Sequence, residues 1–65
     1  MKNGITEKDR EQLKIAERVR EACLQAARDG FREASLSGLC HDGAMEAAVG
    51  SIQSIKLEEI VLRDS

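Results

Sequence analysis

Apolar residues recur every three or four positions along the first half of the chain, which is the spacing of one face of an α-helix. Together with the small residues in phase with them, they are Leu13, Ala16, Val19, Cys23, Ala26, Ala27, Gly30, Phe31 and Ala34. Charged side chains recur with the same period on the opposite side, where they are expected to face water. The pattern predicts a helix over about residues 6–36, and Thr6 followed by Asp9 resembles the capping box that begins such a helix.

Gly30 leaves two alternatives open for this helix. An Asp-Gly pair often marks a turn, and a glycine within a helix costs about 1 kcal/mol relative to alanine. Gly30 nevertheless lies at the centre of the apolar stripe, with Ala26 four residues before it and Ala34 four residues after it. Small residues at every fourth position would let a partner helix approach closely. We expect a continuous helix, and a break at Gly30 is the alternative.

A corner and a shorter helix follow. Ser37-Gly38 is typical of a helix end, and Asp42-Gly43 is typical of a helix start with Asp42 as the N-cap. These signals predict a corner over residues 37–42 and a second helix over about residues 43–55. Its predicted apolar face consists of Met45, Ala48, Val49, Ile52 and Ile55. This phase is lost near Lys56, so the tail over residues 56–65 is either a short separate helical turn or an extended arm.

The composition favours the same class of fold. The sequence contains no proline, 42% of its residues are apolar, and Phe31 is its one aromatic residue. Helix-forming residues are abundant, whereas residues that typically interrupt helices are scarce. We therefore predict a single all-α domain, a helical hairpin made of a long helix, a tight corner and a short helix.

The two predicted helices differ in length, and this mismatch predicts self-association. Thirty-one residues span about 46 Å, whereas thirteen residues span about 20 Å. The short helix therefore reaches only about residues 24–36 of the long one. The apolar positions left without a partner in the same chain are Leu13, Ala16, Val19 and Cys23. Since an exposed apolar stripe is costly in water, we expect these residues to form the interface of a homodimer, a dimeric four-helix bundle. Cover by residues 57–62 of the same chain is the alternative.

Charge and hydropathy exclude several classes of partner. Ten basic and twelve acidic residues give a net charge of −2. Without a basic patch or stacking aromatic residues, nucleic-acid binding is not expected. The uncharged stretches over residues 34–41 and 47–55 are far shorter than the roughly 20 apolar residues of a membrane span. The first residues lack the apolar segment of a secretory signal, so we expect a cytoplasmic location with reduced cysteines.

Cys40-His41-Asp42 is the densest cluster of reactive side chains. A thiol at a helix N-terminus can be unusually reactive, so Cys40 and His41 are candidates for a thiol-based sensor or a metal-binding corner. The other thiol, Cys23, lies about 20 Å from the end of the long helix, too far for a disulfide or shared metal within one chain. We favour Cys40 as a small residue buried under the corner and Cys23 as a core residue. No metal and no cofactor are predicted.

The stretch over residues 34–48 resembles a group of short uncharacterised bacterial proteins. In that group a Gly-Leu-Cys sequence, an acidic residue followed by glycine, and then Glu and Ala join two helices. The residues that carry the likeness are Gly38, Leu39, Cys40, Gly43 and Glu46, and the likeness covers about residues 19–57. It implies a helical hairpin. Some members are labelled acetyltransferases, but an acetyl-CoA site would need a glycine-rich phosphate-binding turn, which this sequence lacks.

These observations predict a protein that binds rather than catalyses. We expect a small helical protein-interaction module that acts through homodimerisation and docking on another protein, with no catalysis of its own. A thiol-based sensor or metal-binding module centred on Cys40 and His41 is the alternative. An enzyme fragment or accessory subunit is suggested by the family label alone.

Overall fold

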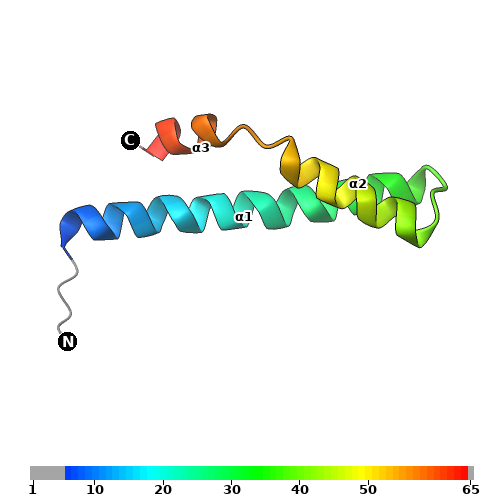
Figure 1. Ribbon diagram of the computed structural model, residues 1–65, viewed down its shortest axis with the longest axis horizontal. Coiled ribbons are helices and arrows are strands. Elements are labelled where there is room, and N and C mark those ends of the chain that lie inside the picture. The colour runs from blue at the N-terminus through cyan, green and yellow to red at the C-terminus, as the bar shows by residue number, and fades with distance from the viewer. Residues whose placement is uncertain (1–5, 65) are drawn as a thin grey trace.

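The computed structural model describes residues 6–64, and all of the regular secondary structure in that range is helical (Figure 1). Helix α1 spans Glu7–Leu36, α2 spans His41–Gln53 and α3 spans Leu57–Asp64. The predicted all-α class is confirmed, and the long helix, the corner and the shorter helix are present in the expected order. The prediction had left the tail open between a helical turn and an extended arm, and the structure has a third helix there.

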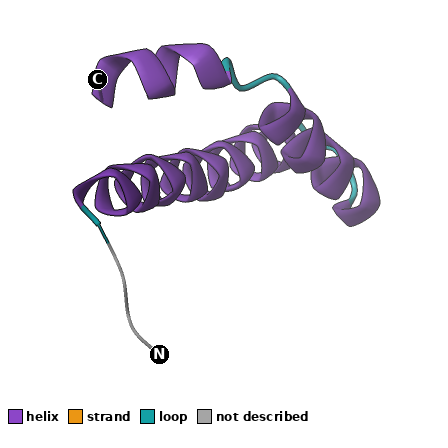
Figure 2. Cartoon of the chain, turned by 60° about the vertical axis from the view of Figure 1, so that its left-hand side comes forward, coloured by secondary structure: helices purple, strands orange, loops and turns teal. Residues whose placement is uncertain are grey.

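The helices form an elongated arrangement. Helix α2 turns back across the C-terminal half of α1, and α3 then runs beside the N-terminal half of α1 in the opposite direction (Figures 1 and 2). The radius of gyration is 15.8 Å, whereas a compact domain of this length has a value of about 11 Å. Large parts of the helix surfaces therefore have no neighbour among residues 6–64.

Helix α1 begins with the predicted capping box. The backbone N–H of Asp9 donates to the Thr6 hydroxyl, and the backbone N–H of Thr6 donates to the Asp9 carboxylate, both at 3.2 Å. The helix then runs through Gly30 without a break. A Cβ atom added to Gly30 would lie 3.0 Å from the carbonyl oxygen of Ala47 and would collide with Ser51 on α2. Gly30 therefore allows α2 to cross α1 at close range.

A Schellman motif makes the corner after α1. The N–H of Leu39 donates to the carbonyl oxygen of Ala34 at 3.0 Å, and the N–H of Gly38 donates to Ser35 at 3.1 Å. Gly38 has a φ of +94°, in the left-handed region that favours glycine. The chain thus reverses within a few residues of the end of α1.

The start and end of α2 differ from the prediction. Cys40, not Asp42, is the N-cap, and α2 begins at His41 rather than residue 43. Cys40 has an extended backbone, and its carbonyl oxygen already accepts from the N–H of Ala44 at 2.9 Å, so the helix starts two residues early. Asp42 lies in the first turn, where its carboxylate favours the positive helix end. The helix ends at Gln53, and Ser54 caps it.

The contact between α1 and α2 is made of small residues. The buried side chains among the described residues are Ala34, Ala44 and Ala48. Ala47 and Ser51 are half-buried on the same side of α2, whereas Met45, Val49 and Ile52 remain at least a third exposed. The predicted apolar face of α2 was therefore wrong at Met45, Val49 and Ile52, whereas Ala48 is buried and Ile55, beyond the end of α2, is half-buried. At the close approach set by Gly30, alanine and serine fit between the helices and larger side chains lie on the flank.

Helix α3 partly covers the N-terminal half of α1. The two helices are in contact, and Ile60 of α3 is half-buried. On α1, Ile15, Val19 and Ala22 are half-buried on one side of the helix. The alternative of cover within the same chain thus holds for part of the stripe.

Candidate interaction surface

The structure divides the four predicted interface residues into two pairs. Val19 and Cys23 are half-buried. Leu13 is 53% exposed, and Ala16 is exposed as well. Leu13 and Ala16 thus still lack a neighbour in the described chain, while Val19 is on the side of α1 that α3 approaches.

A second apolar surface lies where α2 crosses α1. It is a shallow groove of about 500 Å³. Its lining residues are Ala27, Arg28, Phe31, Arg32, Met45, Ala48, Val49 and Ile52. Met45 is 49% exposed and Val49 is 51% exposed, so the larger side chains of α2 form one open wall. The sequence reasoning placed these α2 residues in the hairpin contact and therefore missed the groove.

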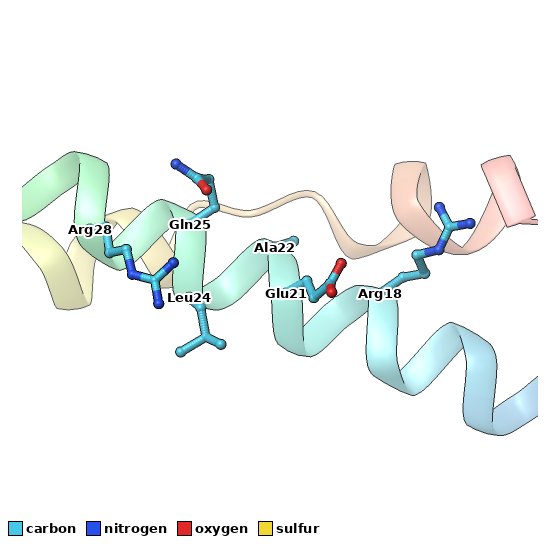
Figure 3. Close-up of a pocket in the computed structure, with 6 residues that line it drawn as sticks. All are labelled: Arg18, Glu21, Ala22, Leu24, Gln25 and Arg28. Carbon is cyan, nitrogen blue, oxygen red and sulfur yellow. The ribbon is translucent and has the colours of Figure 1, made fainter.

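Another hollow runs along α1 itself. The residues that line it are Arg18, Glu21, Ala22, Leu24, Gln25 and Arg28 (Figure 3). In this view Leu24 and Arg28 point to one side of α1, while Arg18 and Gln25 point to the other. A small-molecule site normally encloses its ligand between elements. Because all six residues belong to one helix, this hollow is a stretch of helix surface with both signs of charge.

The corner places Cys40 in solvent. Cys40 is an exposed free thiol, so the prediction that it is buried under the corner was wrong. Leu39 lies close to the start of α2, since a Cβ added to Gly43 would lie 3.0 Å from a methyl carbon of Leu39, but Leu39 is itself 49% exposed. His41 is exposed, and its ring meets the ring of Phe31 edge-on, with centroids 5.6 Å apart and an interplanar angle of 74°. The corner thus joins α1 and α2 through an aromatic contact.

The candidate reactive residues do not converge on a ligand set. Within residues 6–64, no group of three or more His, Cys, Asp or Glu side chains is placed to hold a metal ion. Cys23 and Cys40 are both free thiols, one half-buried on α1 and the other exposed at the start of α2. The chemistry available at the corner is that of one accessible thiol, with an imidazole at the next position of the sequence.

Comparison with known proteins gives no match: no protein-family model, curated protein or solved structure is similar to this chain. The resemblance of the corner to short bacterial hairpin proteins stays a prediction. Across the described part of the chain, none of the helices combines the length and apolar character that crossing a membrane requires.

Proposed function

We propose that this chain is a small helical protein-interaction module that acts through homodimerisation and docking on another protein, with no catalysis of its own. The observation that supports the proposal is the size of the buried side chains. Within residues 6–63 the buried residues are three alanines, and every larger apolar side chain is at least partly exposed. A protein of this kind gains the missing apolar burial by binding another protein surface.

Large apolar side chains that are more than a third exposed occur on all three helices. They are Leu13, Leu24, Leu36, Leu39, Met45, Val49, Ile52, Leu57, Val61 and Leu62. Single exposed apolar residues are ordinary on protein surfaces, but ten of them in so short a chain are not. The surface is thus large enough for a second copy on one side and a further partner elsewhere, for example at Leu62, which is 71% exposed.

Sedimentation equilibrium tests the dimer. At micromolar concentration the mass should be twice the 7.1 kDa of one chain, and helicity should fall on dilution, because folding and association are coupled in small obligate dimers. A fully helical monomer at all concentrations up to the millimolar range would overturn the proposal. Docking on another protein is tested by co-purification from the native cell, followed by titration of the purified partner against the purified chain.

The location proposed for this module is the cytoplasm, where both thiols would be reduced. The exposed thiol of Cys40 is the one observation that favours a thiol-based sensor as a second candidate. A binding role has broader support, because the exposed apolar surface extends over all three helices whereas the thiol chemistry rests on one side chain.

A further inference from the structure

An apolar stripe on α1 stays at least partly exposed after α2 and α3 have packed. Its members are Leu13, Ala16, Leu24, Ala27 and Phe31, with Arg20 in the middle. They follow one another at spacings of three and four residues, which is the spacing of paired helices. Leu24 is 48% exposed, nearly as open as Leu13. At about 100° per residue, Leu13, Leu24 and Phe31 lie about 160° around the helix axis from the residues that α3 approaches.

Helix α2 extends this stripe at one end only. Met45, Val49 and Ile52 form a groove with Phe31 and Ala27, so the C-terminal half of α1 has apolar neighbours on this side. These residues of α2, together with the α1 stripe, are called the outer face below. The N-terminal half around Leu13 has no such neighbours in the described chain.

We propose that the outer face binds a second copy of this chain, with the two α1 helices antiparallel and centred on residue 22. This inference rests on the proposed function and adds the partner's orientation. Leu13 then lies opposite the partner's Phe31, since both are nine residues from the centre. Arg20 lies opposite the partner's Leu24, since both are two residues from it. Each positive charge in the stripe thus meets an aliphatic side chain rather than its own copy.

The lengths of the helices favour this centre. Helix α1 spans Glu7–Leu36, so residue 22 is at its midpoint and the two α1 helices overlap along their whole length. Antiparallel pairing also carries the α2 residues of each copy to the N-terminal half of the partner's α1. Met45 and Val49 are then placed near the partner's Leu13, where the stripe lacks neighbours in the described part of its own chain.

The charges beside the stripe are complementary in this orientation. Glu17 lies five residues before the centre and Arg28 six residues after it, and both are on the same edge of the stripe. In an antiparallel pair the same edges meet, so Glu17 lies beside the partner's Arg28, and this pair occurs twice. Neither residue has an ion-pair partner among residues 6–64. Parallel pairing would instead place Arg20, in the middle of the stripe, beside its own copy, and would put Glu17 and Arg28 on opposite edges from their counterparts in the partner.

The exposed area is sufficient for such an interface. The chain exposes 5388 Å², about 1,300 Å² more than the roughly 4,100 Å² expected for a compact protein of 7.1 kDa. A standard interface takes about 800 Å² from each partner. The chain thus exposes more surface beyond that of a compact protein than one side of an ordinary dimer takes.

Charge exchange tests the pairing of Glu17 with Arg28. The single variants Glu17→Arg and Arg28→Glu should each raise the dimer dissociation constant about five- to tenfold, and the double variant should return it to within about twofold of the starting value. The two residues are eleven positions apart, about 16 Å along one helix, so they cannot pair within a chain. Glu11→Arg is the matched control, because it makes the same charge change about 120° around α1 and should have little effect.

Spin-label distances test the orientation independently of any interface substitution. In a Cys23→Ala, Cys40→Ala background, single labels at Arg10→Cys and Glu21→Cys report the distance between copies by pulsed electron resonance. Antiparallel pairing separates the two residue-10 labels by about 36 Å along the axis and the two residue-21 labels by about 3 Å. Parallel pairing gives similar short distances at both positions.

The outcomes separate this inference from the proposed function. A long distance at residue 10, a short distance at residue 21 and restoration in the double variant would support the antiparallel dimer. A dimer with short distances at both positions, or one whose double variant stays weak, would overturn the orientation and leave the interaction module standing. A monomer in sedimentation equilibrium would overturn both.

Discussion

Gly30 of α1 lies against Ala47 of α2, so close that a Cβ on Gly30 would lie 3.0 Å from the carbonyl oxygen of Ala47. This contact explains a glycine in the middle of a long helix, where it would otherwise cost about 1 kcal/mol relative to alanine. It also sets the distance between the two helices, and with it the requirement for alanine at the contact.

Gly30→Ala should therefore destabilise the protein although alanine is the better helix former. The added methyl group would collide with the Ser51 hydroxyl and lie 3.0 Å from the carbonyl oxygen of Ala47, so the contact with α2 must adjust, and such overpacking costs about 1–3 kcal/mol. Thermal unfolding followed by circular dichroism should show a lower midpoint than that of the unmodified chain.

Gly50→Ala is the matched control for that experiment. Gly50 is also inside a helix, but a Cβ added there meets no atom within 4 Å. This variant should raise stability by up to about 1 kcal/mol, the difference in helix propensity. If both glycine variants raised the midpoint, Gly30 would have no role in the approach of α2.

Gly38→Ala should destabilise the corner by a different mechanism. No atom lies within 4 Å of a Cβ added at Gly38, so the cost comes from the φ of +94° alone. A residue with a side chain pays about 1 kcal/mol or more in this region. Urea unfolding should give a lower midpoint with an unchanged slope. An unchanged midpoint would mean that the corner does not hold this conformation in solution.

Several elements of the fold are encoded locally and could be predicted from the sequence. The capping box at Thr6 and Asp9 involves residues three apart, and the Gly38 corner needs a residue that tolerates a positive φ. Both signals are complete within a few residues. The close approach at Gly30 was also foreseeable, because its phase in the stripe gave a packing reason for glycine.

The face of α2 could not be predicted in the same way. Both sides of α2 are apolar: one carries alanines, and the other carries Met45, Val49 and Ile52. The hydrophobic periodicity of a thirteen-residue helix therefore does not show which side faces α1. The distance between α1 and α2 determines which side of α2 fits against α1. That distance depends on Gly30, which is far from α2 in the sequence. The open groove beside Phe31 follows from the same choice, which is why this part of the candidate surface was missed.

Ala48→Glu should separate α2 from α1. Ala48 is 7% exposed and faces α1 beside Ala44, so a carboxylate there would be buried without a partner at a cost of about 3 kcal/mol or more. Circular dichroism and thermal unfolding should show a large loss of helix and cooperativity. Gln12→Glu, which adds a carboxylate at an exposed position of α1, should change the midpoint little. Equal midpoints for the two variants would show that α2 packs through another face.

The two thiols should differ in their reaction with iodoacetamide, and the difference tests the sensor alternative. Cys40 is exposed at the start of α2, whereas Cys23 is half-buried on α1, so Cys40 should be modified several-fold faster in the native state. Mass spectrometry of the two peptides measures both rates, and unfolding in urea should make them equal.

Cys40 lies outside the outer face, so its alkylation should leave helicity and the sedimentation mass unchanged, with Cys40→Ser as the control. If alkylation of Cys40 instead dissociated the dimer or melted α2, thiol chemistry would control assembly, and the sensor alternative would replace a purely binding role.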